Sequence, residues 1–342
     1  MLDEFDYGLT LGSGAPSLLT IFTGARGIGK TVMLGEAGAV AESHGWVVIS
    51  ETATAGFMGR IGAQMQRHLQ ELGEGPARRR ITGVSAAGFS ITTQLPPEQQ
   101  VGWRETGEAL LRLLASNGTG LVVAVDEIHA ADRAEISQLA AVIQHFITDS
   151  LPIGMLFAGL PAAVSDLLNE GVATFLRRAD RIDLHAVAVG EVERSFAELF
   201  AQGGFEVSSA LLTQAAAATD GYPFLIQLVG YFLWREAEKS SGVVDQAATT
   251  NAITAALRRN ERVVLEAALS TASGRDVDFL CAMAQDEGSS IIGDVAERTG
   301  MSPSAASNYR RRLIEEGLIQ PAGYGRVAFA IPGLRQHMRA AQ

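Results

Sequence analysis

The segment Gly24–Thr31 constrains the fold of this chain more than any other stretch. It reads Gly-Ala-Arg-Gly-Ile-Gly-Lys-Thr, fits the pattern G-x-x-x-x-G-K-[ST], and directly follows the apolar run Leu18–Phe22. Its glycines allow the turn that brings backbone N–H groups against phosphate oxygens, and a helix starting near Gly29 adds its positive dipole end. The motif therefore predicts a buried strand, a phosphate-binding loop and a helix, in that order.

The loop and the residue after it are expected to line a nucleotide site. They are Gly24, Ala25, Arg26, Gly27, Ile28, Gly29, Lys30, Thr31 and Val32. Lys30 supplies a compact charge for the β- and γ-phosphates, and the Thr31 hydroxyl can ligate Mg²⁺. Lysine occurs only at Lys30 and Lys239, and arginine takes the other basic positions. Lysine is thus retained where a point charge serves better than a planar fork.

A second strong signal is the run Leu121–Glu127, in which an apolar strand ends in two acidic residues. We expect Asp126 to hold the Mg²⁺ complex through water, so that Thr31 and Asp126 form the metal site. Glu127 is expected to polarise the attacking water as the general base. Together with the phosphate-binding loop, this strand predicts ATP and Mg²⁺ as cofactors and hydrolysis of ATP to ADP and phosphate.

The order of the motifs indicates the class of the α/β domain. An apolar strand at 46–50 falls between the strand before the loop and the strand that ends in Asp126. The acid after Asp126 is glutamate, and the guanine-reading motif Asn-Lys-x-Asp is absent from the sequence. This combination favours a P-loop NTPase of the additional-strand ATPase class, with a parallel sheet, over GTPases and kinases.

Composition and charge exclude several other classes of protein. The chain is 47% hydrophobic and 19% charged, as in an ordinary globular protein, and its single cysteine excludes intrachain disulfides and cysteine-rich zinc sites. No apolar run reaches the roughly 18 residues of a membrane span, so we expect a cytoplasmic protein without a membrane partner. The net charge of −11 argues against indiscriminate nucleic-acid binding, yet 301–342 hold six arginines against two glutamates. A local basic surface therefore belongs to the end of the chain.

The pattern is interrupted after a predicted helix at 56–72. Gly73–Pro76 ends this helix, and Arg78-Arg79-Arg80 precede a small-residue, β-like stretch that leads to a second predicted helix at 97–116. We interpret 73–96 as a hairpin insertion. Its three arginines either form a solvated charge run or touch DNA or a neighbouring subunit.

The segment Asp126–Asp132, Asp-Glu-Ile-His-Ala-Ala-Asp, resembles the Asp-Glu-x-His segment of the STAND and origin-recognition-like AAA+ ATPases. Leu156–Pro161 looks like their fourth strand with its sensor-1 end, and Phe175–Leu184 like the segment that carries an arginine finger before the fifth strand. Gly221-Tyr222-Pro223 is similar to the Gly-x-Pro motif of their helical lid. The resemblance extends over essentially the whole chain.

Some site residues take their expected roles from this resemblance alone. It implies that Pro223 lies at the nucleotide, and that Arg178 or Arg177 is a catalytic finger for the γ-phosphate. Such a finger usually acts across a subunit boundary, which implies a homo-oligomer or a protein partner. The alternative for either arginine is a paired residue at a helix end.

The sequence departs from the family pattern at its start and at sensor 1. The short segment before the first strand lacks the Gly-Arg pair that packs near the adenine in family members, which is consistent with a truncated start. Gly159-Leu160-Pro161 offers no polar group for the γ-phosphate or the attacking water, so slow hydrolysis is expected.

We expect three domains, namely a P-loop AAA+ ATPase domain at 1–188, a helical lid subdomain at 189–274 and a winged helix-turn-helix domain at 275–342. The lid segments with apolar residues at helical spacing are Ser195–Phe200, Leu211–Thr219, Pro223–Ala237 and Asp245–Leu269. In the last domain, two short helices joined by a turn at Gly300 are followed by a hairpin with a glycine-rich tip, which predicts a winged helix.

The second of these two helices, at 303–316, is expected to face the major groove of double-stranded DNA. The candidate contacts are Ser304, Ser307, Asn308, Arg311 and Arg312 on this helix, with Arg326 on the wing. The rival interpretation is a winged helix that makes protein contacts only.

The sequence thus predicts an AAA+/STAND-like switch ATPase that couples its ATP or ADP state to DNA binding through the winged helix. One alternative is an ATP-gated module whose winged helix binds a protein partner. Another is a nucleotide-binding protein that has no turnover.

Overall fold

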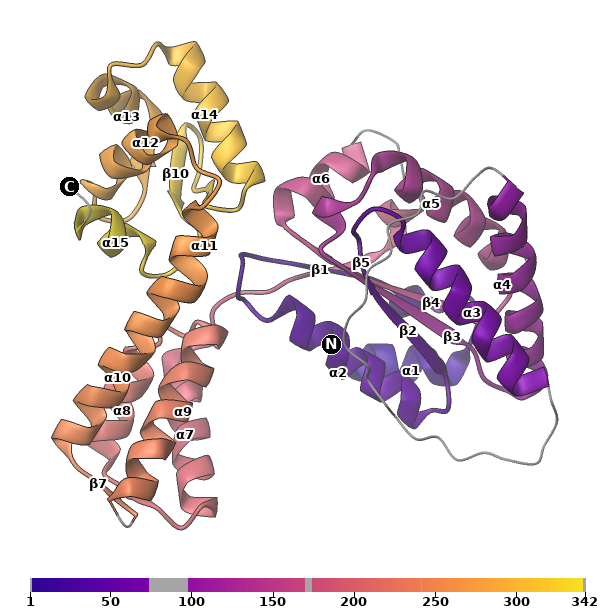
Figure 1. The fold of residues 1–342 in the computed structure, drawn as a ribbon, viewed down its shortest axis with the longest axis horizontal. Helices are drawn as coiled ribbons and strands as arrows, with labels where there is room; N and C mark the ends of the chain where they lie inside the picture. Colours follow the sequence, from indigo (N-terminus) through magenta and orange to yellow (C-terminus); the bar gives the residue numbers. More distant parts are fainter. Residues whose placement is uncertain (1, 74–97, 170–173, 241, 341–342) are drawn as a thin grey trace. The chain divides into compact units, whose positions relative to one another are not determined.

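The computed structural model describes residues 2–73, 98–169, 174–240 and 242–340 (Figure 1). The chain divides into two units, one formed by Met1–Thr23 with Lys30–Asp183 and the other by Gly24–Gly29 with Leu184–Gln342. The predicted hairpin insertion and its three arginines lie outside the described residues. Among the helices that are described, none combines the length and the apolar character needed to cross a bilayer.

Five parallel strands form the sheet of the first unit. They are β1 (Leu19–Thr23), β2 (Val47–Thr52), β3 (Leu121–Asp126), β4 (Ile153–Gly159) and β5 (Asp180–Asp183). Their order is β2-β3-β4-β1-β5, so β4 lies between the strand before the phosphate-binding loop and the strand that ends in Asp126. The predicted parallel sheet of the additional-strand class is confirmed. Because the strands are parallel, their carboxyl ends meet at one edge, where the loop begins.

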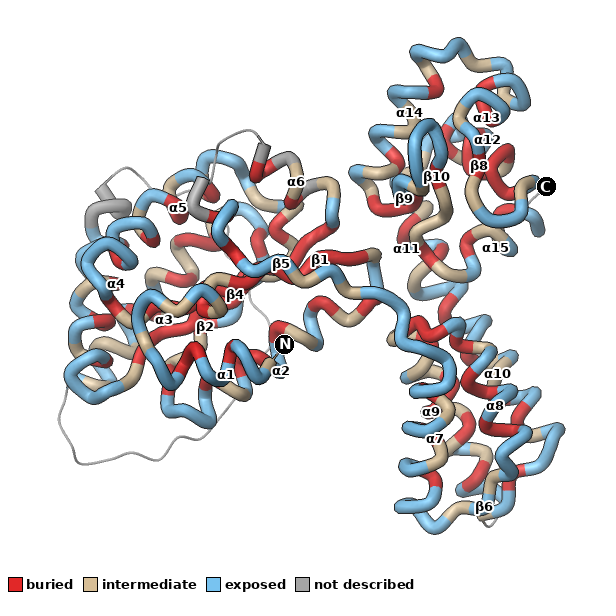
Figure 2. The backbone as a smooth tube through the Cα atoms, turned by 180° about the vertical axis from the view of Figure 1, so that it is seen from behind, coloured by how far each residue is buried: buried red, intermediate tan, exposed pale blue. Residues whose placement is uncertain are grey.

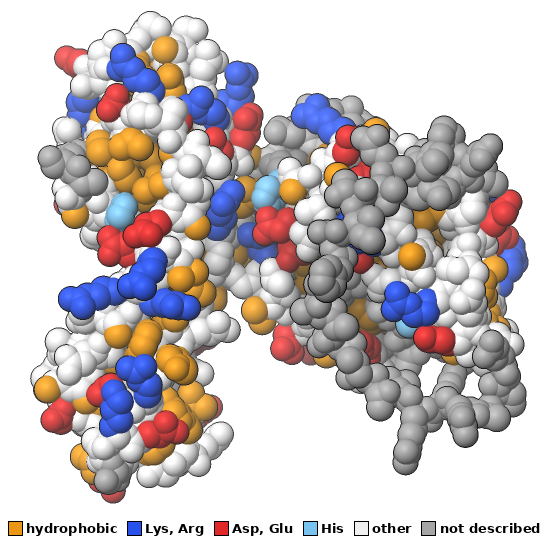
Figure 3. All heavy atoms as spheres, viewed as in Figure 1, with side chains coloured by type: hydrophobic (Ala, Val, Ile, Leu, Met, Phe, Trp, Pro, Cys, Tyr) orange, Lys and Arg blue, Asp and Glu red, His pale blue; other side chains and the backbone are white. Residues whose placement is uncertain are grey.

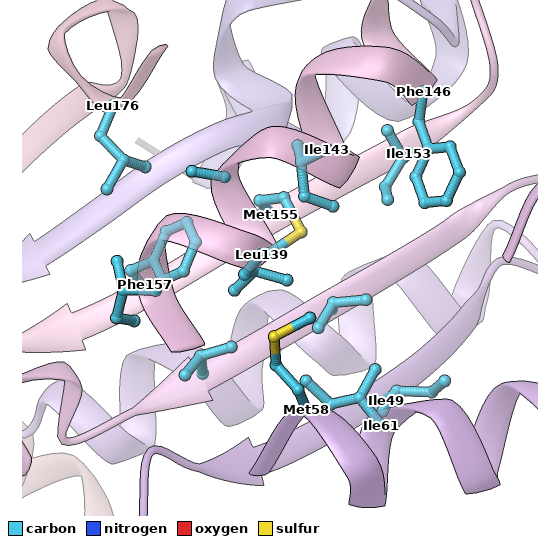
Figure 4. Packing of buried hydrophobic residues seen from close by; sticks show 14 of the residues in the cluster. Ile49, Met58, Ile61, Leu139, Ile143, Phe146, Ile153, Met155, Phe157 and Leu176 are labelled. Atoms are coloured by element: carbon cyan, nitrogen blue, oxygen red, sulfur yellow. The ribbon is translucent and has the colours of Figure 1, made fainter. Parts of the chain in front are cut away.

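Helices pack against this sheet and supply much of its core. α3 (Phe57–Gly73), α4 (Glu98–Ser116) and α5 (Arg133–Thr148) share one hydrophobic cluster with alternate residues of the strands (Figure 4). α2 (Lys30–Ser43) packs against β3 and β4, and α1 (Leu2–Leu11) packs against α2. Each large apolar side chain buried in this way contributes roughly 1.5–3 kcal/mol. The helices contribute most of the side chains in this cluster, and the strands contribute alternate residues, such as Val123 and Val125 of the apolar run before Asp126.

Short elements complete the first unit. They are α6 (Pro161–Asn169) and 3₁₀ turns at Pro16–Leu18, Ile128–Ala130 and Thr174–Arg178. Neither α1 nor α6 was expected from the sequence. The ten residues of α1 lie before the first apolar strand, and α6 follows directly on β4, where the pattern predicted only the end of a strand.

Four helices lie in the part of the second unit that the sequence predicts to be helical, which we call the lid segment. They are α7 (Val189–Gln202), α8 (Ser209–Ala217), α9 (Pro223–Lys239) and α10 (Gln246–Asn260), with two-residue strands β6 (Glu206–Val207) and β7 (Val243–Val244) paired in parallel. Phe196, Phe200, Val229 and Leu233 are buried at their centre. Trp234 packs edge-on against Phe205, with ring centroids 4.7 Å apart, and so adds to this core.

A single helical run connects the lid to the last segment of the chain. α10 continues through a π-helical turn at Glu261–Leu265 into α11 (Glu266–Leu269), in agreement with the predicted helix at 245–269. Ala252 and Ala256 belong to the lid cluster, whereas Leu265 and Ala268 belong to the cluster of the last segment. Figure 2 shows buried positions recurring along α10 and α11.

The last segment contains the predicted helices and hairpin. Its elements are α12 (Gly274–Ala284), β8 (Ser290–Ile291), α13 (Ile292–Thr299), α14 (Pro303–Glu315), β9 (Ile319–Pro321), β10 (Arg326–Phe329) and α15 (Leu334–Ala340). The three strands form an antiparallel sheet in the order β8-β10-β9. Gly300, with φ of 65°, ends α13 and allows the turn into α14, whose first turn is capped by Ser302.

A buried carboxylate ties α12 to α14. Asp276 is 1% exposed and forms the capping box of α12 with Ser273. It also makes an ion pair with Arg312 of α14, whose guanidinium lies over the Tyr309 ring. Burial alone would raise the pKa of Asp276, but hydrogen bonds from Arg312 and Ser273 and the charge of Arg312 bring it below the ordinary value of 3.8.

Replacing this carboxylate should destabilise the last segment. We expect Asp276→Ala to lower the free energy of unfolding by about 2–3 kcal/mol, because it leaves Arg312 unpaired and removes the capping box. Since the folded pKa of Asp276 is the lower one, its contribution is complete above about pH 4 and is lost as the pH falls through that folded pKa. Urea unfolding at several pH values measures both effects, with the exposed Asp278→Ala on the same helix as the control. Equal stability of the two variants at pH 7 would contradict this interpretation.

Candidate functional site

The phosphate-binding loop runs from Gly24 to Gly29, between β1 and α2. Gly27 and Gly29 have φ of 73° and 94°, conformations that side chains rarely adopt. Lys30 opens α2 and is only 6% exposed. Thr31 follows it in the first turn, and the N-terminal turn of a helix is a position that favours an anion. Strand, loop and helix thus follow one another as the motif predicts.

The predicted metal residues lie next to each other. The Thr31 hydroxyl donates to Asp126 Oδ2 at 2.5 Å, although the two residues are 95 positions apart. The other carboxylate oxygen, Oδ1, accepts the backbone N–H of Glu127 at 2.7 Å. A hydroxyl at the start of α2 and a carboxylate at the end of β3 are oxygen ligands of the type Mg²⁺ prefers, so these residues fit the ion. In the described part of the chain, no group of three or more His, Cys, Asp and Glu residues has metal-binding geometry.

Glu127 stands directly after β3 in a left-handed conformation, with φ of 55° and ψ of 40°. This conformation is uncommon for a residue other than glycine and costs of order 1 kcal/mol or more, and such strain concentrates at functional sites. The carboxylate is half-exposed, and its Oε2 lies 2.8 Å from Nε2 of His129. The predicted base is therefore already held by a neighbour that the sequence did not identify as functional.

Of the other strands at this edge, β1 and β5 end in polar residues, whereas β4 does not. Thr23, which ends β1, is fully buried, and its hydroxyl donates to Asp183 at the end of β5. Neither residue was singled out from the sequence, because their contact spans 160 positions. β4 ends at Gly159 and is followed by the buried Leu160, so no polar side chain stands at the sensor-1 position.

The two candidate finger residues lie in the 3₁₀ turn before β5, and both are exposed. Arg177 donates from Nε to the backbone carbonyl of Leu168 at 3.0 Å, so its guanidinium is held by its own unit. Within the described ranges, the Arg178 side chain makes no hydrogen bond or ion pair. The geometry therefore separates two arginines that the sequence left equivalent.

Pro223 and the loop residues before Lys30 belong to the second unit. Pro223 opens α9, and the hydroxyl of the fully buried Tyr222 before it donates to the backbone carbonyl of Arg26. A Cβ on Gly27 would lie within 2.8 Å of two atoms of the Tyr222 ring system, so glycine is required there. Burial raises the pKa of Tyr222, and the phenol thus stays protonated and able to donate.

The structure also locates the three remaining residues that were predicted to line the nucleotide site. Ala25 lies in the phosphate-binding loop, Ile28 packs with Tyr222, and Val32 is exposed on α2.

The six candidate DNA contacts are all exposed on α14 and β10, and Figure 3 shows basic side chains, with acidic ones among them, on the last segment. Ser304, Ser307, Asn308 and Arg311 lie along α14, where Arg311 makes a 3.3 Å hydrogen bond to Asn308. Arg312 differs from them, because Asp276 holds its guanidinium within the segment. Arg326 of β10 donates to the Ser289 hydroxyl at 3.0 Å.

Two parts of the chain match models of known protein families. Residues 9–157 match a family model described as the AAA ATPase domain, and residues 262–338 match one described as a domain of unknown function. None of the curated proteins compared with the chain matches it.

Solved structures resemble the chain over nearly its whole length. A Walker-type ATPase of Pyrococcus abyssi, PABY2304, is 16% identical, with 98% of this chain and 95% of that chain covered and a TM-score of 0.69. The ORC2 protein of Aeropyrum pernix, solved as ADPNP–ADP complexes, is 14% identical, with 99% and 92% covered and a TM-score of 0.64. Cdc6p from Pyrobaculum aerophilum is 15% identical, with 98% and 90% covered and a TM-score of 0.50. At these identities the likeness concerns the fold, and the chain has the fold of the P-loop ATPases of the ORC and Cdc6 kind.

Proposed function

We propose that the protein is a slow, Mg²⁺-dependent ATPase that acts as a switch and couples its nucleotide state to DNA binding. The observation that carries the proposal is the 2.5 Å contact between Thr31 and Asp126, beside a nearly buried Lys30. It supports a preformed site for a phosphate chain with a divalent cation. The ADPNP and ADP named for the Aeropyrum pernix structure favour an adenine nucleotide as the ligand.

Each residue of the site has a part in the proposed reaction. Lys30 and the backbone N–H groups at the start of α2 bind the phosphates, and Thr31 with Asp126 would hold the ion. When bound, Mg²⁺ would neutralise negative charge on the phosphate chain. Glu127 accepts the proton of the water that attacks the γ-phosphorus, while the bond to the β-phosphate oxygen breaks. Gly159 and Leu160 provide no further polar group there, in keeping with slow turnover.

The proposal includes completion of the site by a second subunit. Arg178 is exposed and makes no hydrogen bond or ion pair within the described ranges, so its guanidinium is available to neutralise charge on a γ-phosphate bound elsewhere. A homo-oligomer, or a protein partner with its own nucleotide site, would bring the two together. Arg177 is a weaker candidate because Leu168 holds it.

DNA binding is assigned to the last segment as a winged helix. Its two short helices, the turn at Gly300 and the β9–β10 hairpin support this interpretation. The exposed face of α14 offers a serine, an amide and a guanidinium, groups that read base edges and bind phosphates. The protein-binding alternative is favoured by a specific observation, namely that Arg312 and Arg326 are engaged within the segment.

Steady-state ATP turnover with and without duplex DNA tests the proposal, with Lys30→Ala as the blank. Turnover that exceeds the blank and changes with DNA supports the coupled switch. Turnover that ignores DNA favours a protein partner for the last segment. Bound ATP without any turnover leaves a nucleotide-stabilised scaffold instead.

One arginine of α14 provides the sharper test of DNA binding. We expect Arg311→Ala to weaken duplex binding about tenfold at moderate salt and to lower the salt dependence, because it removes one contact to phosphate or base. Arg275→Ala, an exposed arginine of α12, removes the same charge and is the matched control. Fluorescence anisotropy across a salt series measures both variants. Equal binding by the two would count against the α14 face.

A further inference from the structure

The turn after β3 brings His129 back onto Glu127. Nε2 of His129 lies 2.8 Å from Oε2 of Glu127, and the imidazole is mostly buried, with 18% of its side chain exposed. The role of general base that is proposed for Glu127 does not involve this histidine. The contact is local in sequence, but it depends on how the backbone turns between the two residues.

The backbone of this turn is fixed on both sides of the histidine. Glu127 adopts its left-handed conformation, and its carbonyl accepts the N–H of Ala130 at 2.7 Å, which closes the 3₁₀ turn. Ile128 is 2% exposed and packs so closely on the end of β4 that a Cβ on Gly159 would lie 2.4 Å from it. Asp132 then caps α5 by accepting the N–H of Ala134 at 2.7 Å. The imidazole therefore has little freedom to move away from the carboxylate.

The other ring nitrogen indicates which tautomer is present. Nδ1 of His129 is buried and has no hydrogen-bond partner among the described residues. A proton on Nδ1 would leave a buried donor unpaired, which is unfavourable. The proton therefore belongs on Nε2, which donates it as a hydrogen bond to Oε2 of Glu127.

We propose that His129 is a positioning residue that holds the carboxylate of Glu127 in the orientation needed to accept a proton from the attacking water. The inference rests on the proposed ATPase function, in which Glu127 is the base. His129 keeps its own proton throughout, and the proton from water goes to Glu127. Without the bond, the glutamate side chain is less restrained, and a smaller fraction of enzyme molecules holds the base in the reactive orientation.

The test separates this role from a purely structural one. We expect His129→Ala to lower kcat about tenfold while the KM and the affinity for ATP stay unchanged. His129→Gln should restore most of the rate, because its amide nitrogen reaches the position of Nε2. His129→Asn should not, because its shorter amide matches Nδ1 instead. His145→Ala, an exposed histidine on α5, is the control and should match the wild type.

A double-mutant cycle completes the experiment. In a Glu127→Gln background, single-turnover rates should be the same with and without His129→Ala, because there is no longer a base to position. A further tenfold loss in that background would overturn the inference, as would full kcat in His129→Ala alone. If wild-type turnover does not exceed that of Lys30→Ala, the ATPase proposal fails and the inference falls with it. Turnover in the wild type that His129→Ala leaves intact overturns the inference only.

Discussion

Arg178→Ala should lower kcat for ATP by about 10³-fold or more while nucleotide affinity stays near that of the wild type, as is typical when an arginine finger is removed. The guanidinium contacts the γ-phosphate mainly as negative charge develops, so its loss affects the transition state more than the bound ground state. Turnover assays combined with binding of a fluorescent ATP analogue separate these two effects.

Arg177→Ala is the matched control for this variant. It removes the same charge one residue earlier, but its guanidinium bonds to the carbonyl of Leu168, so we expect a modest loss of stability and nearly normal turnover. Mixing Arg178→Ala with Lys30→Ala tests whether the finger acts between subunits. Each is inactive alone, and the mixture should recover turnover, because Lys30→Ala subunits still carry the finger. Full activity of Arg178→Ala by itself would show that the assignment is wrong.

Glu127→Gln should lower turnover by about 10²–10⁴-fold and leave ATP binding intact, since general-base catalysis contributes factors of that size. Glutamine is nearly isosteric and can accept the hydrogen bond from His129, so the turn after β3 should keep its shape. The variant should therefore retain bound ATP rather than ADP, which can be measured by chromatography of the released nucleotide.

Asp132→Asn is the control for the loss of negative charge in this region. Its side chain caps α5, and asparagine caps helices about as well, so turnover should stay within about twofold of the wild type. Comparable activity of Glu127→Gln and the wild type would assign water activation to another group.

The fold was predictable where apolar runs and motifs coincide. The run before Asp126 is buried on both faces of the sheet, so it was recognisable as a buried strand, whereas its register with β2 and β4 was not predicted. α1 was missed because its ten residues combine acidic and apolar side chains without a cap or motif to mark them. α6 was missed because it has only nine residues and begins at Pro161 almost directly after β4, so no loop separates the helix from the strand in the sequence.

Some features of the site were likewise predictable from the sequence, and others were not. Spacing predicted the residues Thr31 and Asp126, and their contact follows from the sheet order, since β1 and β3 end at the same edge. The ion pair between Arg312 and Asp276 was not predictable, because it depends on how α12 and α14 pack. The sequence also contained no sign that Arg177 and Arg178 have different partners, since that difference depends on the carbonyl of Leu168.

The π-helical turn at Glu261–Leu265 has a consequence for how this chain tolerates insertions and deletions. Each residue of an α-helix turns the chain by about 100° and advances it by roughly 1.5 Å. α10 packs in the hydrophobic cluster of the lid segment, whereas Leu265 packs in the cluster of the last segment. Removing a single residue from the turn would therefore rotate the whole C-terminal segment about the helix axis. Related proteins with a different residue count in this turn would then present α14 in a different direction, even with an identical α14 sequence.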